Sequence, residues 1–222
     1  MNNILEVDGV MLEFGTKRVL QDIYIKCETG KITGLLGRNG SGKTCLMNII
    51  HGMLRPVNAS VRINSKVLLK ARRKPDELLH LTQLNYIPAF LTPQRVFADF
   101  SLEFSIFIEH FPDFEKYFRT KLKRLSGGER RIIEIYVIIA SDTKFCMLDE
   151  PFSHIMPVHL DTIKKLIVQE KENKGILITD HMYEHITDIC DDLYVIRDGK
   201  TFLTDNIQDL EALGYLRDAA EN

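Results

Sequence analysis

The feature that most constrains this chain is a glycine-rich stretch in its N-terminal quarter. Residues 37–44 read Gly-Arg-Asn-Gly-Ser-Gly-Lys-Thr, the G-x-x-x-x-G-K-[ST] pattern of a phosphate-binding loop. The apolar run 32–36 predicts a buried strand before it, and residues 45–51 predict a helix after it. In this order the loop N–H groups and the helix N-terminus form a phosphate site. Lys43 would reach the β- and γ-phosphates, and the Thr44 hydroxyl could ligate Mg²⁺.

Composition excludes several classes of protein. Of the 222 residues 45% are hydrophobic, which is enough for a substantial core, and the net charge of −2 provides no basic field for nucleic acid. The start of the chain lacks the basic-then-apolar pattern of a signal peptide, and no apolar run is long enough to span a bilayer. The four cysteines are scattered without metal-type spacing, so we expect reduced thiols in a cytosolic protein.

The segments that surround the loop strand predict short β-strands. Residues 4–8, 10–14 and 19–27 alternate or run apolar between turn signals, residues 61–69 predict a hairpin, and residues 84–88 predict a strand that ends at proline. We therefore expect antiparallel β structure before the loop strand and a further short strand after the loop helix.

A helical segment is predicted between these strands and the C-terminal part. Its phenylalanines recur at gaps of three and four, which is one face of a helix, and Pro112 and Asp113 would split it in two. The members are Phe97, Phe100, Phe104, Phe107, Phe111, Phe114 and Phe118. Such a stripe is usually the core of a helical subdomain. The alternative is that part of it is exposed and docks a partner helix.

Residues 125–129, Leu-Ser-Gly-Gly-Glu, precede an apolar helix. Ser126 followed three residues later by Glu129 predicts a capping box. A capping box does not explain Gly127 and Gly128, because glycines in a first turn lower helix stability. Glycines there allow another backbone or a phosphate to approach closely.

Acidic residues follow two further buried strands. Asp149 and Glu150 come after residues 145–148, and His181 lies just beyond residues 175–179. Ligands bind beyond the carboxyl ends of strands in open parallel sheets. We therefore expect Asp149 to bind Mg²⁺, Glu150 to take a proton from an attacking water, and His181 to contact a γ-phosphate.

The remaining C-terminal elements are a helix over residues 159–170, a hairpin around residues 197–199, and a closing helix over residues 207–213. No internal repeat is visible.

Together these residues resemble the nucleotide-binding subunit of ATP-binding cassette (ABC) transporters over nearly the whole chain. Residues 37–44 match the Walker A loop, 125–129 the family signature, and 145–150 the Walker B motif with its catalytic glutamate. His181 matches the switch histidine. Phe14 falls where the adenine-stacking aromatic belongs, although by position alone it is equally an ordinary strand residue. The signature and the run before His181 look most like the branch containing the lipopolysaccharide-export and branched-chain amino-acid ATPases.

The resemblance implies an α/β fold: a P-loop NTPase (RecA-like) core with an N-terminal antiparallel β subdomain and an inserted helical subdomain. Residues 1–222 would form one domain, with the β subdomain and Walker A core over 1–88, the helical subdomain over 89–140, and the Walker B and switch-histidine core over 141–222.

The implied cofactors are ATP and Mg²⁺. The implied site comprises Phe14, Gly37, Arg38, Asn39, Gly40, Ser41, Gly42, Lys43, Thr44, Ser126, Gly127 and Gly128 for ATP, Thr44 and Asp149 for Mg²⁺, and Glu150 and His181 for catalysis.

The implied partners are a second cassette, with a homodimer as the expected form, and a separate transmembrane permease. No nucleic acid is expected, and the chain would lie on the cytoplasmic face of the membrane. Each ATP would sit between the Walker A loop of one chain and Ser126, Gly127 and Gly128 of the other.

Two departures from the family pattern stand out. The glutamine expected after the strand at 84–88 is replaced by Ala89, with Gln94 close by, and the acid expected at the end of S-x-x-D is replaced by Met156. Both would slow ATP hydrolysis. They keep open a second function, a soluble ATP-binding switch with weak or no hydrolysis, whereas a P-loop kinase would leave the signature and His181 unexplained.

Overall fold

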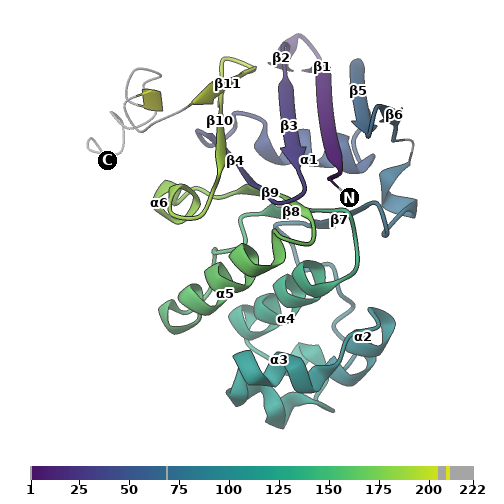
Figure 1. Ribbon diagram of the computed structural model, residues 1–222, viewed down its shortest axis with the longest axis vertical. Coiled ribbons are helices and arrows are strands. Elements are labelled where there is room, and N and C mark those ends of the chain that lie inside the picture. The colour runs from purple at the N-terminus through teal and green to yellow at the C-terminus, as the bar shows by residue number, and fades with distance from the viewer. Residues whose placement is uncertain (1, 69, 205–208, 211–222) are drawn as a thin grey trace.

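The computed structural model describes residues 2–68, 70–204 and 209–210 (Figure 1). Among these residues one sheet has five strands, which pair antiparallel in the order β2-β1-β5-β6 with β3 also paired to β1. Its strands are β1 (Ile4–Phe14), β2 (Lys17–Leu20), β3 (Tyr24–Glu28), β5 (Asn58–Ile63) and β6 (Lys66–Val67).

The second sheet has the order β11-β10-β4-β9-β8-β7 over the described residues. Its strands are β4 (Ile32–Gly37), β7 (Leu78–Leu81), β8 (Phe145–Asp149), β9 (Gly175–Thr179), β10 (Asp192–Arg197) and β11 (Lys200–Thr204). Strands β10, β4, β9, β8 and β7 run parallel, and only the edge strand β11 is antiparallel within this sheet. The carboxyl ends of the five parallel strands therefore share one edge.

The described residues also form six α-helices and three short 3-10 turns. They are α1 (Lys43–His51), α2 (Pro93–Asp99), α3 (Phe104–His110), α4 (Gly127–Ala140), α5 (Pro157–Glu170) and α6 (Tyr183–Thr187), with short 3-10 turns η1 (Ala71–Arg73), η2 (Pro112–Tyr117) and η3 (Leu122–Arg124). Helix α1 packs between the two sheets, whereas α2 and α3 lie at the end of the molecule opposite the antiparallel sheet (Figure 1).

Strand β4 is buried on both faces, as its continuous apolar run requires. Ile32 and Leu36 pack into a cluster with α4 and α5, while Leu35 packs into a second cluster with α1 and the antiparallel sheet. Successive strand side chains point to opposite faces, so this single strand joins the two cores. The loop that follows β4 is anchored by both.

The phenylalanine stripe is mainly core. Phe97, Phe107, Phe111 and Phe114 are buried, and ring centroids 5.1 Å apart link Phe107 to both Phe97 and Phe111. The predicted split at proline is present between α3 and η2. A second break separates α2 from α3, where Ser101 has a φ of 57° that a helix cannot contain.

Several predicted strands need correction. Residues 4–8 and 10–14 form the single strand β1, which continues through Gly9 at φ 61°, and residues 19–27 are divided between β2 and β3. The strand predicted over 84–88 is absent from this described segment. Its place in the sheet is taken by β7, which ends earlier, at Leu81.

The C-terminal hairpin is confirmed. Arg197 pairs with Lys200, and Asp198 and Gly199 have φ values of 52° and 76°, the positive values that a two-residue type I′ turn requires. The closing helix predicted over 207–213 lies outside the described residues except for positions 209 and 210, which are helical.

Candidate functional site

The phosphate-binding loop runs from the end of β4 into α1. Gly42 caps the helix with a φ of 103°, a conformation that favours glycine. At Gly37 an added Cβ would lie 2.5 Å from Ser41 Oγ and 3.1 Å from the Ile196 carbonyl oxygen, so a side chain has no room. The predicted strand, loop and helix are therefore present, and the tight packing around Gly37 explains why glycine stands there.

Lys43 is the charged centre of the loop. Its side chain is buried and its Nζ donates to the Gly37 carbonyl at 2.7 Å. Burial lowers the pKa of Lys43, and the carboxylates of Glu150, Asp149 and Asp180 act in the opposite direction. These three acids follow or end β8 and β9, and all three lie close enough to Lys43 for their charges to act on it.

Asp149 ends β8 with a fully buried carboxylate. Neither carboxylate oxygen has a hydrogen-bond partner within the described residues. Burial raises the pKa of Asp149 to about 6, and the nearby Thr44 hydroxyl, which lies outside hydrogen-bonding geometry, opposes that shift. An unpaired buried carboxylate beside a hydroxyl is the hard-oxygen donor set that Mg²⁺ prefers. These residues fit the predicted metal.

Glu150 and His181 meet on the same edge of the sheet. His181 Nδ1 lies 3.9 Å from Glu150 Oε2, 3.3 Å from Asp180 Oδ1 and 3.5 Å from Ser153 Oγ. Asp180 also accepts from the backbone N–H groups of Phe152 and Met182, so it ties the turn after β8 to the turn after β9. Sequence reasoning had not assigned Asp180 this part.

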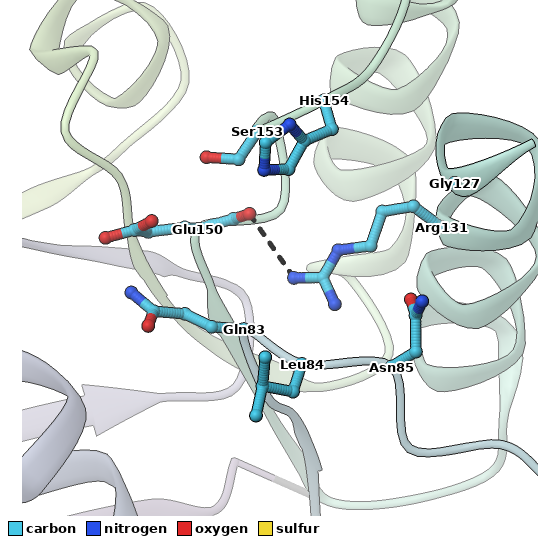
Figure 2. Close-up of a pocket in the computed structure, with 8 residues that line it drawn as sticks. All are labelled: Gln83, Leu84, Asn85, Gly127, Arg131, Glu150, Ser153 and His154. Carbon is cyan, nitrogen blue, oxygen red and sulfur yellow. Dashed lines mark hydrogen bonds between the residues drawn. The ribbon is translucent and has the colours of Figure 1, made fainter.

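Gln83 corrects the assignment made at Ala89. Strand β7 pairs in parallel with β8, Leu81 opposite Leu148, so Gln83 emerges at the same sheet edge as Glu150. Both residues line a pocket of about 390 Å³, which Figure 2 shows. The structure thus overturns the predicted strand at 84–88 on which the departure at Ala89 was based, and it makes Gln83 the glutamine that follows the strand paired with β8.

The error has a physical cause at residues 84–88. The N–H of Ile87 donates to Glu134 Oε1 at 3.3 Å, and its carbonyl accepts from the Arg130 guanidinium. Side chains of α4 thus satisfy backbone groups that a strand would otherwise have satisfied, and the segment stays irregular. The run Leu78-Leu79-His80-Leu81 followed closely by Gln83 was the signal available in the sequence.

The signature segment begins α4 as predicted. Ser126 Oγ accepts from the Glu129 N–H at 3.2 Å, and Glu129 Oε2 accepts from the Ser126 N–H at 2.8 Å, which completes the capping box. The two glycines differ. A Cβ on Gly128 would lie 2.7 Å from the His154 carbonyl oxygen, whereas one on Gly127 would meet no described atom within 4 Å outside its chain neighbours and the backbone of its own helix. Gly128 serves close packing within the chain, and Gly127 faces open space beside Glu150.

Two other predicted positions lie at the surface. Phe14 is 53% exposed at the end of β1, in the hairpin with β2, whose Leu20 packs against Gly42 of the loop. Met156 is 62% exposed at the N-cap of α5 and makes no side-chain cap hydrogen bond. An aspartate at position 156 could cap α5 with its carboxylate, and methionine cannot.

The fold and this site define a P-loop nucleotide-binding protein. A family model described as ABC transporter matches residues 20–153, and the chain belongs to this family. The chain is an ATP-binding and ATP-hydrolysing subunit of that family.

Curated relatives cover almost the full chain. The lipopolysaccharide export system ATP-binding protein LptB of Haemophilus influenzae is 30% identical over 91% of this chain and 90% of its own length. LptB of Escherichia coli strain K12 is 29% identical over 82% of both. The ribose import ATP-binding protein RbsA of Caldanaerobacter subterraneus is 27% identical over 90% of this chain, which spans 44% of RbsA.

Solved structures agree on the fold. The ATP-binding subunit of an ABC transporter superposes with a TM-score of 0.78 at 18% identity, over 96% of this chain and 94% of its own. The ADP conformation of MJ1267, an ATP-binding cassette of an ABC transporter, gives 0.77 at 21% identity, over 97% and 96%. The predicted fold class is confirmed, and the named relatives favour a transporter subunit over a soluble switch or a kinase. Within the described part of the chain, no helix is both long and apolar enough to cross a membrane.

Proposed function

We propose that Glu150 is the general base for ATP hydrolysis and that His181 contacts the γ-phosphate. The observation that carries this proposal is the convergence of Glu150 and His181, 3.9 Å apart, at the sheet edge where Lys43 and Asp149 also lie. A carboxylate at this place can accept the proton of a water that attacks a phosphate held by the loop.

The oxygen donors of Thr44, Asp149 and Gln83 would hold Mg²⁺. A bound Mg²⁺ would supply positive charge against the negative charge that develops on the phosphate oxygens. The buried, unpartnered oxygens of Asp149 support this assignment, and so does the position of Gln83 on the pocket shared with Glu150.

The second cassette is proposed to be another copy of this chain. Gly127 is open to an approaching phosphate and lies at the N-terminus of α4, a helix of 14 residues. Ser126 and Gly127 of one copy would thus meet the ATP held by the loop of the other. Gly128 supports that arrangement by packing on His154 of its own chain.

The separate permease is proposed to dock near the segment between β7 and α2. Leu84 and Phe90 are 81% and 67% exposed there, and residues of α2 and α3, which follow this segment, line a groove of about 610 Å³. Phe104 and Phe118 line this groove, so a part of the phenylalanine stripe is available to an apolar helix while the rest forms core.

The test compares ATP turnover and oligomeric state of the wild-type chain with those of Glu150→Gln in the presence of Mg²⁺. We expect wild-type hydrolysis, and for Glu150→Gln retained ATP binding, strongly reduced turnover and a trapped dimer. Glu172→Gln is the matched control. Glu172 is exposed in the loop before β9, whereas His181 and the site lie beyond the other end of β9. An ATP-bound Glu150→Gln monomer with undiminished turnover would remove Glu150 from this role.

A further inference from the structure

Arg131 connects the signature helix to two strand ends. Its side chain is only 6% exposed, yet its donors reach three backbone carbonyls. Nη1 donates to Thr82 at 2.6 Å, and Nη2 donates to Asp149 at 2.9 Å and to Glu150 at 3.3 Å. Figure 2 shows the guanidinium extending from α4 to the Glu150 carbonyl. One side chain thus holds the ends of both β7 and β8.

This contact set uses both arms of a guanidinium. Nη1 and Nη2 of Arg131 each bind a carbonyl beyond a different strand, whereas lysine carries all its N–H donors on one nitrogen at the end of a shorter side chain. The buried charge is opposed by Glu134, one turn along α4, whose Oε2 lies 3.9 Å from Arg131 Nη1. Because a buried charge is costly without a partner, Glu134 offsets part of the cost of burying Arg131.

Glu150 is the residue that most needs this support. Its φ of 49° is a left-handed conformation, which is strained for a residue with a side chain and is found where surrounding structure enforces it. The Glu150 N–H is held by the Thr179 carbonyl at 2.8 Å, and the Glu150 carbonyl is held by Arg131. These contacts, together with the Ser153 N–H that donates to the Glu150 carbonyl at 3.4 Å, fix the peptide groups on either side of Glu150 and so the direction in which its side chain leaves the backbone.

We propose that Arg131 is a positioning residue for ATP hydrolysis. It acts through the backbone of Glu150, which it links to the helix that begins with the signature glycines. This inference rests on the proposed role of Glu150. The hydrogen bonds of Arg131 go to backbone carbonyls and not to the Glu150 carboxylate.

The test is Arg131→Lys, with Arg130→Lys as the matched control. Arg130 lies next to Arg131 on α4 and contacts Glu134 at 3.2 Å and the Ile87 carbonyl, and no hydrogen bond in the described chain joins it to Asp149 or Glu150. We expect Arg131→Lys to lower kcat by about 10- to 100-fold, as a small misplacement of a catalytic group does, while KM and ATP affinity change by less than about 3-fold. Arg130→Lys should keep kcat within about 2-fold of wild type.

A double-mutant cycle separates positioning from general damage. If Arg131 acts through Glu150, adding Arg131→Lys to Glu150→Gln should produce no further loss in single-turnover rate, because the group being positioned is already gone. Multiplying losses, or equal changes in binding and turnover, would identify a structural role and overturn the proposal. Arg131→Gln, a smaller planar donor, is measured in the same way if the lysine variant does not fold.

The two levels of proposal fail differently. Wild-type hydrolysis that is insensitive to Glu150→Gln would overturn the role of Glu150 and this inference with it. Hydrolysis that depends on Glu150 but is unchanged by Arg131→Lys would leave the proposed function intact and remove only Arg131.

Discussion

The buried side chain of His80 predicts how the free energy of unfolding depends on pH. It lies on β7, is 6% exposed, and both ring nitrogens lack a hydrogen-bond partner within the described residues. Its ring meets that of His51, at the end of α1, edge to face with centroids 5.3 Å apart. Burial lowers the pKa of His80 from 6.5 to about 3, and the neighbouring His51 and Arg131 add to that shift.

The sign of the pH effect follows directly. Because the folded pKa is depressed, the unfolded chain binds a proton at His80 below pH 6.5 whereas the folded chain does so only near pH 3. The contribution of neutral His80 is therefore complete above pH 6.5 and is lost as the pH falls toward 3. At pH 4.5 the loss is two pH units, or about 3 kcal/mol of the free energy of unfolding.

We predict that His80→Leu removes this loss. Urea unfolding of wild type and variant is measured at pH 7.5 and pH 4.5, and the quantity compared is the change in the free energy of unfolding between the two pH values. The variant should lose about 3 kcal/mol less than wild type. It should also be about 1 kcal/mol more stable at pH 7.5, since two unpartnered polar atoms are removed.

His154→Asn is the control. His154 is exposed and has a φ of 65°, which asparagine tolerates, so this variant should follow the wild-type pH dependence. Equal losses for wild type and His80→Leu between pH 7.5 and 4.5, at equal urea slopes, would refute the view that His80 is held neutral in the core.

Two further predictions use paired variants. Gly128→Ala should be about 2 kcal/mol less stable than Gly127→Ala in thermal or urea unfolding, because only Gly128 faces the His154 carbonyl oxygen, at 2.7 Å from an added Cβ; equal stabilities would contradict that packing. Gln83→Ala should raise the Mg²⁺ concentration needed for half-maximal ATP hydrolysis by about 10-fold, as loss of one ligand does. Gln94→Ala, an exposed position on α2, should leave it unchanged, and the reverse result would return the glutamine role to Gln94.

Restoring Gln83 to the site changes how the chain compares with its family. If Gln83, which follows β7, holds Mg²⁺ as proposed, the departure predicted at Ala89 no longer applies and the one at Met156 remains. The case for a weakly hydrolysing switch loses one of its two supports, whereas the expectation of slow turnover now rests on Met156 alone.

Local features of the sequence determined the loop, the capped signature helix and the acids at the end of β8. Each depends on residues adjacent in the chain: glycines that allow the turn before Lys43, a serine and glutamate three apart at Ser126, and an apolar run that stops at Asp149. Such short-range constraints are readable without a partner segment.

Only the tertiary structure decided which distant residues meet. Whether residues 78–81 or 84–88 form the strand depended on pairing with β8 and on Glu134 and Arg130, which satisfy the backbone of Ile87. The close packing at Gly128 depended on where His154 lies. Backbone hydrogen-bond partners far apart in the chain decide these outcomes, because a short apolar run becomes a strand only when another strand is present to pair with it.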